Sequence, residues 1–186
     1  MIQLRALERG ELCRVGEIDR TELIEGIYYL EEGALVLKPE RYDMRGWLPG
    51  TLDETKACLI DCHDRGGWCA GAFDGDRLVG IVVLESRYIG ANEDQLQLVF
   101  LHVSHGYRDQ GLGARLFEAA RAVAAQRGAK GLYVSATPSE HSIAFYLARG
   151  CRLNPHPDPE LLAEEPEDIH LLCDVKTPGQ SFTTLA

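Results

Sequence analysis

The sequence predicts a single α/β (α+β) domain, and three observations lead to this prediction. The chain has 186 residues, 45% of them hydrophobic, and only 8 prolines, which suits one sizeable core rather than disorder. An apolar run from Leu96 to Val103 is followed by Gly111-Leu112-Gly113-Ala114 and then by a helical pattern. Two turn signals, Glu31-Glu32-Gly33 and Asp74-Gly75-Asp76, each separate a pair of apolar runs, as in β-hairpins.

The run from Leu96 to Val103 is predicted to be the central strand of the sheet. Its β-forming residues are nearly continuous, as expected for a strand buried on both faces. After Gly113, apolar residues recur at three- and four-residue spacing, which predicts an amphipathic helix that ends at Gly128. These apolar residues are Leu116, Phe117, Ala120, Val123 and Ala124.

The elements predicted before this strand are bounded by turn and capping signals. Thr51 followed by Glu54 resembles a capping box at the start of a helix. Gly66-Gly67 ends that helix. In chain order, the elements are a strand at Ile2 to Leu7, a helix at Glu8 to Ile18, hairpin runs at Thr21 to Leu30 and Ala34 to Lys38, a helix from Thr51 to about His63, and strands at Trp68 to Phe73 and Leu78 to Tyr88.

The C-terminal part is predicted to complete the same sheet. Its elements are a strand at Gly131 to Ala136, a helix at Ser139 to Ala148, and strands that begin at Cys151 and at Ile169. Asn154 to Asp168 holds four prolines and many acidic residues, so we expect a surface loop. Thr177 to Ala186 is expected to be a loosely held tail. No repeat or second domain is evident, so residues 1–186 are predicted to form one domain.

The turn before the long helix has the properties of an anion site. Helix-start amides lack backbone partners, the helix dipole favours negative charge there, and Gly111 and Gly113 allow close approach to the backbone. Arg108 adds a cation. The spacing matches neither the dinucleotide fingerprint nor the P-loop. The alternative is a tight turn beside a solvated arginine.

Two motifs in this order resemble a known family. Arg108-Asp109-Gln110-Gly111-Leu112-Gly113 resembles the Q/R-x-x-G-x-G/A signature of the GCN5-related N-acetyltransferases, the GNAT superfamily. Downstream, the segment from Ser139 to Gly150 resembles the family's N-x-x-A-I-x-F-Y-x-x-x-G motif. The resemblance extends from about residue 78 to 175. It implies a GNAT-like fold with a mixed, mostly antiparallel central sheet flanked by helices.

The resemblance also implies an activity and a set of site residues. It implies an N-acetyltransferase with acetyl-CoA as cosubstrate, whose pyrophosphate would sit on the turn amides. The residues of that turn are Arg108, Asp109, Gln110, Gly111, Leu112, Gly113 and Ala114. The strand end from Leu101 to Val103 would pair with the pantetheine arm, and Tyr146 matches the acid that protonates the leaving thiolate. Ser139 stands where the family usually has an asparagine that contacts the cofactor arm.

No general base is assigned by the sequence. Some family members use a glutamate on the central strand, but the matching position here is Gln97, which cannot act as a base. Glu85, Asp94 and His102 are alternatives, each also explained by a structural or solvated role. A water relay, or no dedicated base, is an equal alternative.

The acceptor is expected to be a primary amine of a small molecule or a peptide. Aromatic residues of the region that the family often places near the acceptor, Tyr28, Tyr29, Tyr42 and Trp47, either line that site or pack in the core. One alternative keeps the cofactor without the chemistry, as a non-catalytic acyl-CoA-binding or regulatory module. The other is a different phosphate-ligand binder that shares only the turn.

The composition limits which partners and which cellular compartment we expect. The formal net charge of −10 and the pI near 5.0 predict no nucleic-acid partner. No apolar run or leader pattern suggests a membrane span or a signal peptide, so we expect a cytoplasmic monomer or homodimer. The six cysteines are expected to be reduced. Cys58, Cys62, His63 and Cys69 lack a zinc-type C-x-x-C pair, so no metal is predicted.

Overall fold

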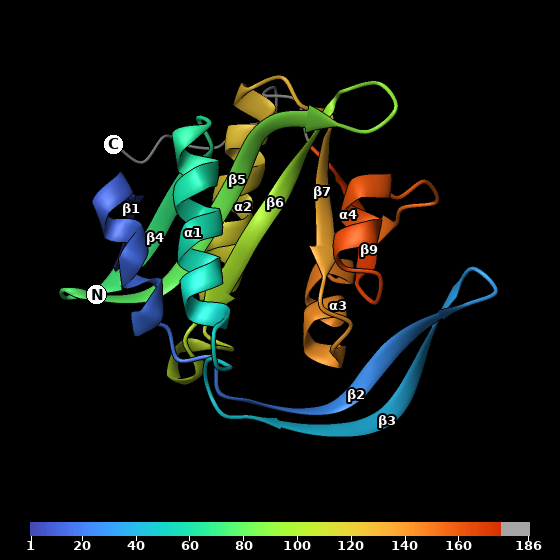
Figure 1. Ribbon diagram of the computed structural model, residues 1–186, viewed down its shortest axis with the longest axis horizontal. Helices are drawn as coiled ribbons and strands as arrows, with labels where there is room; N and C mark the ends of the chain where they lie inside the picture. The colour runs from blue at the N-terminus through green and yellow to red at the C-terminus, as the bar shows by residue number, and fades with distance from the viewer. Residues whose placement is uncertain (176–186) are drawn as a thin grey trace.

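The computed structural model describes residues 1–175, so the predicted tail lies outside the described residues. The main sheet has seven strands in the order β1-β4-β5-β6-β7-β9-β8 (Figure 1). Their bounds are β1 Ile2–Ala6, β4 Trp68–Asp74, β5 Arg77–Ile89, β6 Gln95–Val103, β7 Gly131–Ala136, β8 Arg152–Leu153 and β9 Ile169–Asp174. Only the β6–β7 pair is parallel, and the other five pairs are antiparallel. The predicted α+β class with a mostly antiparallel sheet is therefore confirmed.

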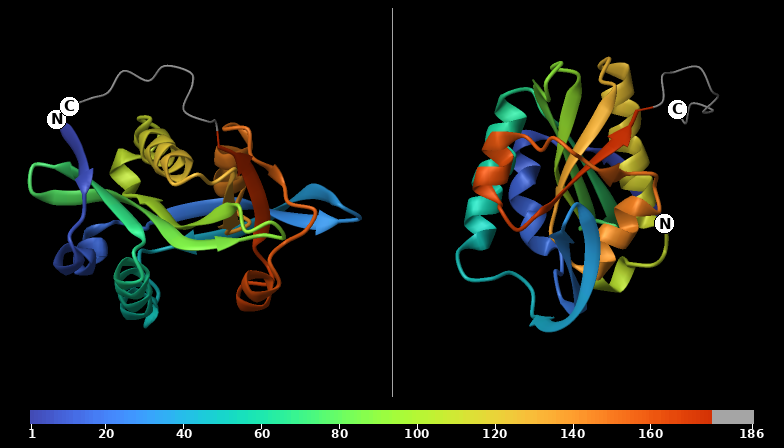
Figure 2. Two further views of the ribbon diagram at one scale, coloured as in Figure 1. Left: turned by 90° about the horizontal axis from the view of Figure 1, so that it is seen from above. Right: turned by 90° about the vertical axis from the view of Figure 1, so that its right-hand side faces the viewer.

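Helices cover both faces of this sheet. On one face α2 (Leu112–Gln126) and α3 (Glu140–Leu147) pack over the larger core cluster, and on the other the 3-10 helix η1 (Arg9–Glu17) and α1 (Thr51–Asp64) pack over a second cluster. The short helix α4 (Pro159–Glu164) lies on the same side as α1 (Figure 2). The two faces of the central strands therefore pack against different helices and different core clusters.

A second, two-stranded sheet stands beside the first. It is the hairpin of β2 (Glu22–Glu31) and β3 (Ala34–Met44), which turns at the predicted Glu31-Glu32-Gly33. The Tyr28 amide donates to the Pro138 carbonyl at 2.7 Å, so the hairpin contacts the connection between β7 and α3. β2 has the length of its predicted run, shifted by one residue, whereas β3 extends beyond its predicted run to Met44.

β6 is the fourth of the seven strands, which confirms the predicted central strand. The prediction that β6 is buried on both faces is only partly correct, because Leu96 and Leu98 are buried whereas Val99 to Val103 are partly exposed. Pairing with β7 stops at Gln97 opposite Tyr133, and the two strands then separate (Figure 1). A register shift in the β5–β6 pairing falls between Leu98 and Phe100.

The helix predicted at Glu8 to Ile18 is present as the 3-10 helix η1, with Glu8 and Ile18 as its caps. Two other local predictions were wrong. The helix N-cap of α1 is Gly50, not Thr51, whose hydroxyl donates to the Leu48 carbonyl instead of capping the helix. The acidic loop contains α4, capped by the Asp158 side chain with Pro159 at its first turn.

The expectation that all cysteines are reduced is also wrong. Cys151, just after α3, forms a disulfide with Cys173 in β9, and both are buried. Spacing along the chain did not reveal this pair because 22 positions separate them. The remaining cysteines, Cys13, Cys58, Cys62 and Cys69, are free.

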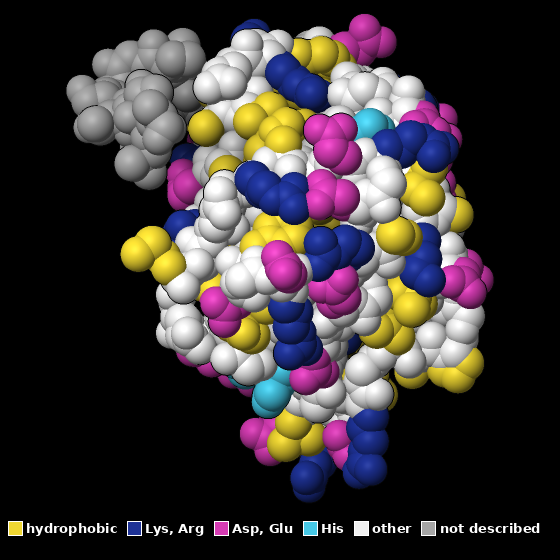
Figure 3. Space-filling view, turned by 90° about the vertical axis from the view of Figure 1, so that its left-hand side faces the viewer, with side chains coloured by type: hydrophobic (Ala, Val, Ile, Leu, Met, Phe, Trp, Pro, Cys, Tyr) yellow, Lys and Arg dark blue, Asp and Glu magenta, His cyan; other side chains and the backbone are white. Residues whose placement is uncertain are grey.

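The surface carries interspersed charges. On the face shown in Figure 3, basic side chains stand beside acidic ones rather than forming a continuous basic surface. Two bidentate pairs, Arg5 with Glu11 and Arg9 with Asp64, are examples of this arrangement. In the part of the chain that the structure describes, no helix is long and apolar enough to cross a membrane.

Candidate active site

The turn between β6 and α2 has a backbone shaped by glycine. Gly111 is the N-cap of α2 in the left-handed conformation, with φ of 77°, and no side chain caps the helix start. A Cβ built on Gly111 would meet no atom within 4 Å. The helix-start amides are therefore open to an external acceptor, as an anion site requires.

Gly113 has a different role from Gly111. A Cβ at Gly113 would lie 3.1 Å from the Phe145 ring, so the missing side chain lets α3 pack closely against the start of α2.

The Arg108 side chain has two partners within the protein. Its Nε donates to the Val103 carbonyl at 3.1 Å, and its guanidinium pairs with Glu22 of β2 at 3.1 Å. Glu22 therefore neutralises part of the charge expected beside the turn.

A cavity of about 570 Å³ joins this turn to the end of β6 and to α3. It brings together most of the predicted site residues: Leu101, Val103, Arg108, Asp109, Gly111, Gly113, Ala114 and Tyr146. Gln110, Leu112 and Ser139 do not line it. Leu112 is 4% exposed in the core, and the exposed Gln110 side chain donates to the Gly106 carbonyl.

Ser139 is the N-cap residue of α3. It is 2% exposed, and its hydroxyl accepts from the Ser142 amide at 3.3 Å as the N-cap of this helix. The same hydroxyl donates to Ser142 Oγ at 3.0 Å. The Ser139 hydroxyl thus both donates a hydrogen bond to Ser142 and accepts one from it, so we expect a structural role for this side chain.

Replacing Ser139 with alanine should test that role. Loss of an N-cap side chain lowers the free energy of unfolding by about 0.5–2 kcal/mol. Urea unfolding measures this loss, and calorimetry of acetyl-CoA binding to the folded variant should show unchanged affinity. A large loss of affinity with unchanged stability would instead favour the contact that the family's asparagine makes.

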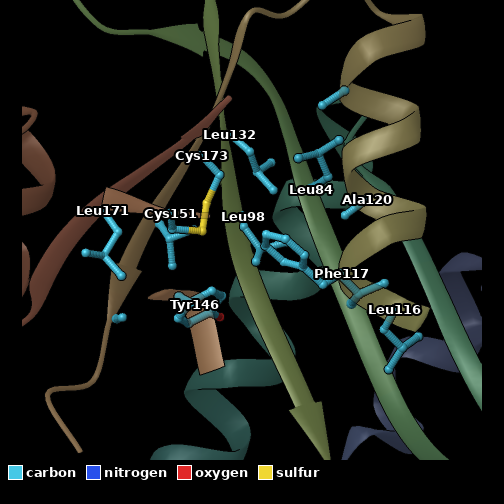
Figure 4. Close-up of a cluster of buried hydrophobic side chains, with 14 of the residues drawn as sticks. Leu84, Leu98, Leu116, Phe117, Ala120, Leu132, Tyr146, Cys151, Leu171 and Cys173 are labelled. Atoms are coloured by element: carbon cyan, nitrogen blue, oxygen red, sulfur yellow. A yellow bond between two sulfur atoms is a disulfide. The ribbon is translucent and has the colours of Figure 1, made fainter. Parts of the chain in front are cut away.

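Tyr146 lies in the cavity wall and in the core at once. It is 9% exposed, and its ring meets Phe117 and Phe145 edge to face at 5.8 and 5.1 Å (Figure 4). Burial raises the pKa of the Tyr146 phenol above its ordinary value. The hydroxyl is therefore protonated at neutral pH and available as a donor.

Of the three base candidates from the sequence, Glu85 and Asp94 do not line this cavity, and His102 lines it with a lowered pKa. Burial opposes ionisation of Glu85, but hydrogen bonds from Arg65 and the Ser86 amide hold its pKa below the ordinary range. Asp94 precedes β6 and pairs with Lys130 at 3.6 Å, far from the strand's other end. His102 lines the cavity, but burial and the nearby arginines lower its pKa to about 3.

Sequence reasoning missed three charged residues of the cavity, Glu22, Glu140 and Arg149. The Arg149 guanidinium lies 3.5 Å from the centre of the Phe145 ring, and burial lowers the pKa of Arg149. Its position three residues after Tyr146, just past the end of the predicted helix, was a usable signal, because residues three apart on a helical turn lie on one side. Glu22 comes from the hairpin, whose docking near α3 has no local sequence signal.

Comparison with known proteins agrees with this geometry. The sequence profile described as the acetyltransferase (GNAT) family matches residues 33–151. The chain belongs to this family. The predicted resemblance is thereby confirmed, together with the assignment as an acetyltransferase. No curated protein sequence matches the chain.

Solved structures of this GNAT type share the fold at low identity. Nourseothricin acetyltransferase superposes with a TM-score of 0.71 at 19% identity, covering 94% of this chain and 99% of its own. The PaiA N-acetyltransferase of Thermoplasma acidophilum, in complex with coenzyme A, gives 0.61 at 17% identity with 94% and 99% coverage. The ribosomal-protein-S18-alanine N-acetyltransferase of Escherichia coli gives 0.57 at 16% identity with 99% and 100% coverage.

Proposed function

We propose that this GNAT protein transfers an acetyl group from acetyl-CoA to a primary amine of a small molecule or peptide. One observation carries the proposal: the open helix-start amides at Gly111 and the protonated Tyr146 line the same cavity. An anion site and a proton donor in one cavity suit a phosphate-bearing thioester whose leaving group must be protonated.

The cavity residues fit acetyl-CoA. The open space at Gly111 accommodates a phosphate against the backbone amides of residues 111–114. Beyond Gln97 the edge of β6 that faces β7 has no ladder partner, so the backbone of Leu101 to Val103, apart from the Val103 carbonyl that accepts from Arg108, can pair with an amide-containing arm. When bound, acetyl-CoA supplies the activated acetyl group.

The protein's own residues then have separate tasks. The Gly111 turn holds the phosphates, and the end of β6 orients the arm and keeps it extended. Tyr146 lines the cavity and holds a proton at its hydroxyl. That proton serves the sulfur of the leaving group.

The acceptor is proposed to approach from the opposite face of β6. A second cavity of about 310 Å³ lies there, between α1 and the strand, and Phe100 and Val99 form its inner wall. Glu54 and Glu165 line its rim, which suits an acceptor that carries positive charge. Nourseothricin acetyltransferase and the ribosomal-protein enzyme, both similar in fold, illustrate small-molecule and protein acceptors respectively.

A transfer screen tests the proposal. Acetyl-CoA is incubated with polyamines, aminoglycosides and peptides, and both thiol release and the acetylated product are measured. We expect a product with at least one cationic amine class. Binding of acetyl-CoA without transfer to any acceptor would support the non-catalytic module instead, and competition by ATP for the site would support a different phosphate ligand.

A further inference from the structure

Asp168 occupies a distinctive place at the start of β9. In β7 the side chains of Val134 and Ala136 belong to the α2-side core, so Ser135 between them faces the opposite side. Ser135 Oγ donates to Asp168 Oδ2 at 3.1 Å, which puts the carboxylate on that side too. This is the face that carries α1 and α4 (Figure 2).

Ser135, the hydrogen-bond donor to this carboxylate, lies on β7 where β6 and β7 have separated. The last parallel pair is Gln97 with Tyr133, so Ser135 lies two residues beyond the pairing on β7, as Val99 does on β6. On β6, Phe100 lines the acceptor-side cavity and the next residue, Leu101, lines the cofactor-side cavity. Phe100 of β6 and Ser135 of β7 thus both lie beyond the last paired residues, and Glu165, three residues before Asp168, lines the acceptor-side cavity with Phe100.

The surroundings of Asp168 contain no cation. Within residues 1–175 it forms no ion pair, whereas Glu85, Asp94 and Glu22 are each paired with a basic side chain. The charged or titratable groups that act on it or feel its charge are Glu165, after α4, and Tyr146, on α3. Its one side-chain hydrogen bond comes from the neutral Ser135.

Resting on the proposed function, we infer that Asp168 is the general base that deprotonates the acceptor's ammonium group. An N–H bond of the ammonium breaks, its electron pair stays on nitrogen, and the proton forms an O–H bond with the Asp168 carboxylate. The proton later passes to solvent. Asp168 on the acceptor side and Tyr146 on the cofactor side thus form a base and acid pair across the separated strands.

The pKa of Asp168 suits this task. Burial raises it to about 6, against the smaller opposing effect of the Ser135 hydrogen bond. At neutral pH the group is still mostly ionised, yet it is a stronger base than an ordinary aspartate. Burial is the main cause of the raised pKa of Tyr146, and the negative charge of Asp168 adds a smaller effect in the same direction.

Asp168→Asn is the test, because asparagine can still accept the Ser135 hydrogen bond. We expect kcat/KM for a cationic amine to fall by about 10²- to 10³-fold at pH 7. The acid limb of the wild-type pH profile should have an inflection near 6 that the variant lacks, and the deficit should narrow as the pH approaches the pKa of the amine. Acetyl-CoA affinity should be unchanged.

A readout independent of turnover is the titration of Tyr146. Ultraviolet difference titration of the phenol, identified by its loss in Tyr146→Phe, should show a lower pKa in Asp168→Asn. Glu167→Gln is the control, because it removes an exposed carboxylate one residue away. It should keep wild-type turnover and the inflection near 6.

The two hypotheses fail differently. If the wild type acetylates an amine and Asp168→Asn retains more than about a third of its kcat/KM with the same inflection, the assignment of the base is overturned and the transferase function stands. If the wild type acetylates no amine in the screen, both are overturned.

Discussion

Tyr146→Phe should lower kcat by about 10²- to 10⁴-fold while acetyl-CoA affinity stays close to that of the wild type. The substitution keeps the ring that packs against Phe117 and Phe145 and removes only the hydroxyl. Because Tyr146 lines the cavity and its hydroxyl is protonated, loss of the hydroxyl should remove the proposed acid and little else. Steady-state kinetics with any accepted amine, at matched folded fraction, measure the effect.

Tyr133→Phe is the matched control. Tyr133 is also a buried tyrosine, but its hydroxyl bonds His170 at 2.6 Å and accepts from the Asp158 amide at 3.0 Å. Its loss should lower stability and leave kcat nearly unchanged. A decrease smaller than about threefold in Tyr146→Phe would remove Tyr146 from the mechanism and favour the non-catalytic alternative.

Gly111→Val should weaken acetyl-CoA binding by about 10- to 100-fold. A β-branched residue is strained at a φ of 77°, so the turn should leave the left-handed conformation and redirect the helix-start amides. The new side chain would also fill the open space in which a phosphate is proposed to lie. Isothermal titration calorimetry on the folded variant measures the affinity.

Gly128→Val provides the comparison for strain alone. Gly128 follows the other end of α2 with a φ of 86°, and a Cβ there also meets no atom within 4 Å. This variant should lose stability to a similar extent but bind acetyl-CoA normally. Equal affinities in both variants would place the coenzyme phosphates somewhere other than the Gly111 turn.

The sequence predicted the elements whose signals are local. The hairpin turns, the apolar run of β6 and the periodicity of α2 depend on neighbouring residues only, and all three are observed. Thr51 failed as a cap because Gly50, with a positive φ, takes the N-cap position. The helix α4 was missed because its prolines and acidic residues resemble those of a loop, although Asp158-Pro159 is a good helix start.

The site was predictable where a motif specified it and not where the tertiary arrangement did. The motifs located Tyr146 and the glycine turn. They could not show that Leu112 faces the core, nor that the Ser139 side chain caps α3. Asp168 lay unnoticed in an acidic segment, because its partner Ser135 and the separation of β6 from β7 depend on how β6, β7 and β9 assemble.

The disulfide gives the two sides of this site a covalent link. Cys151 follows the helix that carries Tyr146, and Cys173 lies in the strand that begins after Asp168 (Figure 4). The bond closes the loop that contains α4, and cross-linking a loop of this length stabilises a fold by about 3 kcal/mol, mainly by restricting the unfolded chain. The redox poise of the surroundings therefore bears on how stable the fold is that brings the proposed acid and base together.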